Sequence, residues 1–112
     1  MSTSNIIKIK SAKHLRKVFR RHHGNVVVKF YAKWCKPCTM LSGVFKSKSK
    51  SKSKSESKSK SESRTGFCEV DVDELKDVKE MYEVSQLPTV IRFEKGVLKK
   101  KGEGLQNAQR SI

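Results

Sequence analysis

The stretch Trp34-Cys35-Lys36-Pro37-Cys38 decides how the rest of the chain is interpreted. Two cysteines are separated by two residues, and a proline precedes the second. An apolar run from Val26 to Tyr31 comes shortly before them and is typical of a buried strand. Downstream, Leu87-Pro88-Thr89-Val90 places a proline at the start of another apolar run. A C-x-x-C pair after a strand, in a chain that alternates strands and helices, indicates a thiol–disulfide redox site.

The composition limits the classes of protein that need to be considered. The chain has 112 residues, enough for one domain with a modest core, so we expect a single domain over 1–112. The net charge of +15 favours acidic partners, nucleic acid or other polyanions non-specifically. No secretory signal and no membrane-spanning run is visible, and three cysteines are an odd number for a secreted disulfide scaffold. We therefore expect a monomer in the cytosol or the nucleus, without a membrane partner.

Hydrophobic periodicity predicts alternating strands and helices on both sides of the cysteine pair. Ser11 and Asp73 are placed to cap helices. In the helix after the cysteines we expect Met40, Leu41 and Phe45 to face inward, and Met81 likewise in the next helix. The predicted strands are Asn5–Lys10, Val26–Tyr31, Gly66–Val72, Thr89–Phe93 and Val97–Lys101, and the predicted helices are Ser11–His22, Lys36–Phe45, Glu74–Tyr82 and a short Leu105–Ile112.

A low-complexity segment over residues 46–64 interrupts this pattern. Serine occupies every odd position from 47 to 63, and lysine occupies most even positions, so the segment carries a net charge of +6 (eight Lys or Arg and two Glu). Neither alternate set is apolar, so no face can be buried, and like charges repel along the run. We predict a disordered or loosely solvated loop that binds polyanions non-specifically.

Taken together, the motifs resemble the thioredoxin family. The resemblance rests on the cysteine stretch, on Val70-Asp71-Val72-Asp73-Glu74, on Leu87-Pro88-Thr89 and on Phe93-Glu94-Lys95-Gly96, which occur in thioredoxin order. It implies an α/β thioredoxin fold, a central mixed sheet with helices on both faces, here with a shortened final helix. It also implies that Trp34, Lys36, Pro37, Leu87, Pro88 and Thr89 contact the substrate. In the family the proline at position 88 follows a cis peptide bond.

The two cysteines have different expected roles. Cys35 would lie exposed at the start of a helix, where the helix dipole and Lys36 favour its thiolate, so it is the expected nucleophile. Cys38, one turn further along, would be the resolving thiol that releases a mixed disulfide. Two alternatives are a pair of core cysteines and half of a zinc site. Zinc would need two more ligands, and only Cys68, His22 and His23 are spare, so we expect no metal.

Lys29 is the main departure from the thioredoxin pattern. The family usually has a buried acid at this strand position, where it acts as base for the resolving cysteine. A cation there should favour the Cys35 thiolate, so we predict that Lys29 tunes the pKa of the nearby thiol. A buried lysine is costly and would tend to lose its proton or extend towards solvent.

The sequence therefore predicts an enzyme, a dithiol oxidoreductase that reduces disulfide-containing proteins and holds no bound cofactor. By resemblance, a thioredoxin reductase would supply the electrons, indirectly from NADPH. One alternative is a redox-impaired thioredoxin-like scaffold that binds nucleic acid or other polyanions through its basic loop, and another is a non-functional divergent copy. The intact dithiol and Pro88 favour the enzyme, whereas Lys29 and the repeat favour the alternatives.

Overall fold

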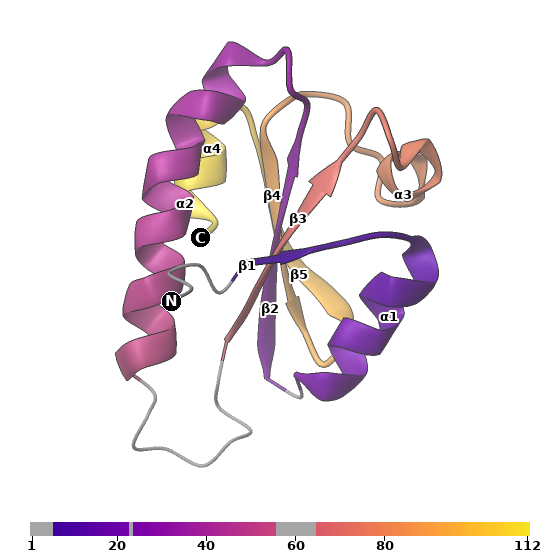
Figure 1. Ribbon diagram of the computed structural model, residues 1–112, viewed down its shortest axis with the longest axis vertical. Helices are drawn as coiled ribbons and strands as arrows, with labels where there is room; N and C mark the ends of the chain where they lie inside the picture. Colours follow the sequence, from indigo (N-terminus) through magenta and orange to yellow (C-terminus); the bar gives the residue numbers. More distant parts are fainter. Residues whose placement is uncertain (1–5, 23, 56–64) are drawn as a thin grey trace.

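Five strands from the described residues, 6–22, 24–55 and 65–112, form a mixed sheet at the centre of the computed structural model (Figure 1). The strand order is β1-β3-β2-β4-β5; the first three strands in this order are parallel, and β4 and β5 are each antiparallel to the strand before them in that order. In chain order the elements are β1 (Ile6–Lys8), α1 (Ala12–Arg21), β2 (Asn25–Tyr31), α2 (Lys36–Ser55), β3 (Gly66–Asp71), α3 (Lys76–Met81), β4 (Thr89–Glu94), β5 (Val97–Glu103) and α4 (Leu105–Arg110).

Helices cover both faces of the sheet, as predicted. Figure 1 shows α2 and α4 together on one side and α1 and α3 on the other. Successive strand residues point to opposite faces, so β2 contributes Val28 and Phe30 to one apolar cluster and Val27 to the other. The central strand is apolar on both sides because both sides are covered. In the described ranges, no helix combines the length and the apolar composition that crossing a membrane requires.

The first helix follows the prediction closely. The hydroxyl of Ser11 accepts a hydrogen bond from the His14 backbone N–H at 3.0 Å, which satisfies one of the free donors of the first turn. Leu15 and Val18 are the buried residues of α1. The preceding strand is shorter than predicted, with Asn5 outside the described residues.

The third helix begins later than predicted, and Asp73 is not its cap. The backbone carbonyl of Asp71 accepts hydrogen bonds from the backbone N–H groups of Glu74 (3.1 Å) and Leu75 (2.9 Å). This turn delays the start of α3 to Lys76. The prediction that Met81 faces inward is also wrong, because this last residue of α3 has an exposed side chain. Val84, three residues later, is buried in the apolar cluster on the α1/α3 side of the sheet.

The second helix is longer than the sequence pattern predicts. α2 runs without interruption to Ser55, so the prediction of a disordered or loose loop is wrong for residues 46–55; residues 56–64 lie outside the described part of the chain. Once Leu41 and Phe45 have anchored the helix, each further residue adds a hydrogen bond without a new nucleation cost. Lysine is also a good helix former. Contrary to the prediction that no residue there is buried, Ser49 is buried and its hydroxyl donates to the Lys46 carbonyl at 2.8 Å.

Two further regions differ from the prediction, one in α2 and one near the C-terminal end of the chain. Met40 was predicted to face inward but is exposed, because it lies beside the buried stripe that Cys38, Leu41 and Phe45 form at helical spacing. The edge strand β5 extends two residues beyond the predicted Lys101. Gly104 then turns the chain with φ +88°, and the short α4 packs against α2 and the sheet.

Candidate active site

The two cysteines of the motif lie where β2 passes into α2. The backbone N–H of Cys35 donates to the Ala32 carbonyl at 3.1 Å, and this turn places Cys35 directly before the first helical residue. Cys35 and Cys38 form a disulfide, with their Cα atoms 5.3 Å apart. The backbone N–H of Cys38 points at the Cys35 sulfur at 3.2 Å. A hydrogen bond of this kind stabilises negative charge on Cys35 once the disulfide is opened.

The exposure of the two cysteines corrects one prediction. Cys35 was expected to be exposed, but only 5 % of its surface is accessible, and 2 % in Cys38. In the disulfide each sulfur is turned towards the other and away from water. Cys35 nevertheless lines a surface groove of about 680 Å³, and Cys38 is not among the residues that line it. Cys35 is therefore more accessible than Cys38, as predicted, but it is less exposed than predicted.

The groove contains four of the six residues predicted to contact a substrate. They are Trp34, Lys36, Pro37 and Leu87. Trp34 is the most exposed large apolar side chain of the described residues, with 72 % of its surface accessible. Trp34 follows β2 and Leu87 precedes β4, and the antiparallel pairing of these neighbouring strands brings both residues to one surface beside the disulfide.

The other two predicted contacts lie below this surface. Pro88 and Thr89 are both buried and do not line the groove. The Thr89 hydroxyl donates to the Gln86 carbonyl at 2.6 Å. The Leu87–Pro88 peptide bond is cis, as the resemblance implied.

One wall of the groove was missed by the sequence analysis. It comes from the β3–α3 connection and α3, and from Ser85. The indole N–H of Trp34 donates to the Asp73 carboxylate at 2.9 Å, which holds the exposed ring against this wall. The signal was the Val70–Glu74 motif, but Asp73 was interpreted as a helix cap. The residues of this wall are Val72, Asp73, Lys76, Lys79, Glu80 and Ser85.

Comparison with known proteins identifies this arrangement. The family model described as Thioredoxin matches residues 5–111. The chain belongs to the thioredoxin family. It is 33 % identical over 99 residues to a thioredoxin of Mycoplasma genitalium, which covers 88 % of this chain and 86 % of that protein. A disulfide-forming C-x-x-C pair on a thioredoxin fold makes the protein a thiol–disulfide oxidoreductase.

Solved thioredoxin structures have the same fold. The Schistosoma mansoni thioredoxin superposes with a TM-score of 0.74 at 28 % identity and covers 97 % of this chain and 100 % of that one. The Malassezia sympodialis thioredoxin has a TM-score of 0.76 at 26 % identity, with 91 % and 81 % covered. These relatives give no support to the alternative of a polyanion-binding scaffold, and the predicted binding of polyanions by residues 46–64 stays a prediction.

In this thioredoxin Lys29 occupies a buried polar site on the α2 side of the sheet. Only 4 % of its surface is accessible. Its ammonium group lies 3.7 Å from the carboxylate of Glu69, its partner in the β2–β3 register, and donates to the Ser42 hydroxyl at 3.3 Å. The rings of Tyr31 and Phe45 lie at 5.3 and 5.1 Å. The side chain therefore does not extend to solvent, and a carboxylate offsets its charge.

Burial and Glu69 act on Lys29 in opposite directions. Loss of hydration lowers the pKa of Lys29 below its ordinary value of 10.5, and the nearby Glu69 carboxylate partly raises it again. Ser42, which accepts from Lys29, donates to the Cys38 carbonyl at 3.3 Å, so a chain of hydrogen bonds links Lys29 to the backbone of the second cysteine. The predicted influence of Lys29 on the thiols stays a prediction. Sequence reasoning found Lys29 but missed Glu69 and Ser42.

Cys68 is separate from this chemistry. It is fully buried in the cluster between the sheet and the α1/α3 layer, as its alternation with Val70 predicted. Burial raises the pKa of its thiol to about 12, so at neutral pH it is protonated and unreactive. Among residues 6–22, 24–55 and 65–112, no three His, Cys, Asp or Glu side chains form a group that could hold a metal ion.

Proposed function

We propose that this thioredoxin reduces disulfides in other proteins, with Cys35 as the attacking thiol and Cys38 as the resolving thiol. The observation that supports this assignment best is the asymmetry of the pair: Cys35 lines the groove and Cys38 lies beneath it. A substrate disulfide resting in the groove can therefore meet Cys35 first. Trp34 and Leu87, which line the groove together with Cys35, offer it an apolar surface beside the dithiol.

The reaction transfers two electrons to the substrate. In the reduced protein, the Cys35 thiolate attacks one substrate sulfur; a new sulfur–sulfur bond forms, the substrate disulfide breaks, and the leaving thiolate takes up a proton. The Cys38 thiol then loses its proton and attacks the Cys35 sulfur. This releases the second substrate thiol, which is protonated, and leaves the Cys35–Cys38 disulfide.

Return to the dithiol requires two electrons and two protons from an external reductant. A thioredoxin reductase, itself reduced by NADPH, is the donor that the family membership suggests. The proposal accordingly places the protein in a reducing compartment, the cytosol or the nucleus, as a monomer that meets its reductase and its substrates in turn.

Reduction of insulin, coupled to NADPH and thioredoxin reductase, tests this function. Cys35→Ser should abolish turnover, and Cys38→Ser should accumulate mixed disulfides that migrate as larger species on a non-reducing gel. Cys68→Ala is the matched control, because it removes a thiol that lies outside the groove, and its turnover should equal that of the wild type. Full multiple turnover by Cys38→Ser would refute the assignment of the two roles.

A further inference from the structure

The groove beside the dithiol is lined by charged side chains as well as by apolar ones. Its lining includes three lysines, Lys36, Lys76 and Lys79, and two acids, Asp73 and Glu80. Lys36 lies inside the C-x-x-C motif, and the other two lysines come from α3, so positive charge is present on both walls.

Some of the charged groups near the groove already have a hydrogen-bond or ion-pair partner within the protein, and others are available to a substrate. The Asp73 carboxylate accepts the hydrogen bond from the Trp34 indole at 2.9 Å. Glu74, next to it, is paired with Lys33 at 3.9 Å. None of the three groove lysines forms an ion pair with another residue in the described part of the chain. A bound chain would therefore meet three available ammonium groups and one available carboxylate, that of Glu80.

From this we infer that the groove favours protein disulfides flanked by acidic residues; the inference rests on the proposed reduction of protein disulfides. An extended substrate segment would pack on the Trp34 ring and the other apolar groups of the groove, with its own carboxylates next to Lys36, Lys76 and Lys79. The overall charge of +15 attracts acidic chains from a distance, and salt screens that attraction. The groove lysines add a short-range preference that depends on where the substrate charges lie.

The expected size of this preference follows from exposed ion pairs. Lys36 and Lys76 are exposed and Lys79 is half-buried, and each pair that such a lysine makes changes an equilibrium by a factor of roughly 1.5 to 5. Replacing two lysines by acids exchanges attraction for repulsion, so the ratio of kcat/KM values for acidic and basic substrates should fall by about tenfold or more.

The test uses three synthetic disulfide peptides of one sequence, with aspartate, lysine or glutamine beside the cystine. The wild type should reduce the acidic peptide with the highest kcat/KM and the basic peptide with the lowest. Lys76→Glu/Lys79→Glu should lower the acidic-to-basic ratio by about tenfold. Glu80→Lys should act in the opposite direction and raise the ratio severalfold.

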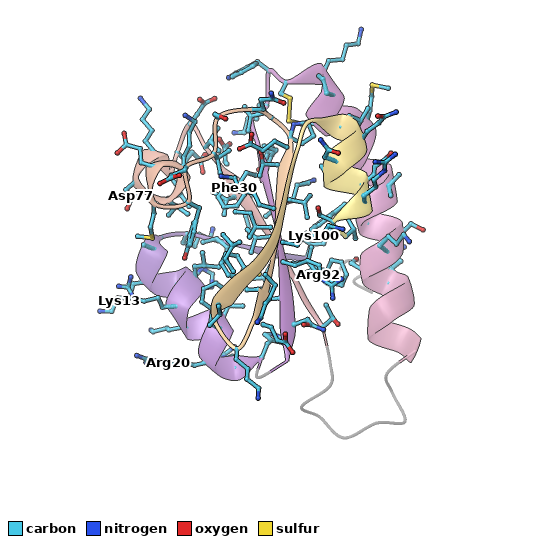
Figure 2. All side chains as sticks on the ribbon, turned by 180° about the vertical axis from the view of Figure 1, so that it is seen from behind. Lys13, Arg20, Phe30, Asp77, Arg92 and Lys100 are labelled. Atoms are coloured by element: carbon cyan, nitrogen blue, oxygen red, sulfur yellow. A yellow bond between two sulfur atoms is a disulfide. The ribbon has the colours of Figure 1, made fainter. Side chains whose placement is uncertain are left out.

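A control variant separates the groove from the overall charge. Lys17→Glu/Arg20→Glu makes the same change in net charge at exposed positions of α1; Figure 2 shows Arg20 at the opposite end of the molecule from the disulfide. Its acidic-to-basic ratio should stay within about twofold of the wild type. A control effect as large as that of the α3 variant, or a wild-type ratio near one, overturns the inference. If the wild type fails to reduce even the neutral peptide, the proposed function itself is wrong.

Discussion

The buried pair of Lys29 and Glu69 allows a quantitative test of what holds a positive charge inside this fold. The two charged groups are 3.7 Å apart, and the side chains are 5 % and 24 % exposed. With an effective dielectric constant of about 20, their attraction is about 4.5 kcal/mol. Removing one partner of a buried pair costs about 3–5 kcal/mol, because the other charge is left without compensation.

Glu69→Gln and Lys29→Met should therefore have unequal effects. Glu69→Gln leaves the lysine charge buried, and we expect it to lower the free energy of unfolding by about 2 kcal/mol at pH 7. The value is below the range for a fully buried pair because Glu69 is partly hydrated and Lys29 can lose its proton. Lys29→Met removes the buried charge and places a flexible thioether near the ring of Phe45, so it should stay within about 1 kcal/mol of the wild type.

The pH dependence gives a second, independent readout. The pKa of Lys29 is lowered in the folded state, so between that value and 10.5 the unfolded chain binds more protons than the folded one. The Lys29 contribution to the free energy of unfolding therefore rises with pH across this window. Without the Glu69 carboxylate the window extends to lower pH, so the deficit of Glu69→Gln should shrink as the pH rises from 7 towards 10.

Urea unfolding of the oxidised proteins, followed by far-UV circular dichroism, measures these differences. The variant Lys29→Met/Glu69→Gln should be about as stable as Lys29→Met alone, because glutamine then faces no charge. Burial raises the pKa of Cys68 to about 12 in every variant, so its contribution cancels in the differences between variants. Burial and then the Glu69 carboxylate raise the pKa of Tyr31 to about 12, but an unfolded tyrosine titrates only near pH 10, so below that pH the differences report Lys29. The reasoning is refuted if Lys29→Met is destabilised as much as Glu69→Gln, or if the Glu69→Gln deficit does not change with pH.

Two further predictions concern Cys68 and two glycines, one in α2 and one in β5. The reduced native protein should rapidly incorporate iodoacetamide at Cys35 but not at Cys68 at pH 8, and incorporate three equivalents after denaturation, as located by mass spectrometry, because Cys68 is fully buried and its pKa is raised to about 12; rapid modification of Cys68 in the native state would contradict this. Gly43→Ala, inside α2 with open space at its Cβ position, should stabilise the protein by about 0.5–1 kcal/mol in urea unfolding. Gly102→Ala should destabilise it by about 2 kcal/mol or more, since the added Cβ would overlap the Asn107 carbonyl at the β5–α4 contact, and equal stability of the two glycine variants would contradict the close approach.

The sequence by itself determined the features that depend on local pattern. The apolar run from Val26 to Tyr31 gave a central strand, and the serine before the first amphipathic segment gave a capped helix. The cysteine spacing gave the disulfide pair, because two residues between cysteines in a helical turn bring their Cα atoms to 5.3 Å. Each of these outcomes is decided by neighbours within a few positions along the chain.

Tertiary structure decided the features that depend on distant residues. Glu69 lies forty positions from Lys29, and only the parallel register of β2 and β3 shows that a carboxylate offsets the buried charge. The α3 wall of the groove could not be predicted from the sequence either. Aspartate is a residue type that often caps helices, but the Asp73 carboxylate accepts a hydrogen bond from the Trp34 indole instead.

In the low-complexity segment, too, local sequence and tertiary packing have different effects. Its alternating serines and lysines contain no apolar face, so local composition predicted a loop. The helix that precedes it is anchored by the packing of Leu41 and Phe45 against the sheet, and the chain continues as helix to Ser55 because elongation from an anchored end needs no further nucleation. Composition describes what a segment could do alone, whereas packing of the adjoining residues sets where the helix starts and how far it extends.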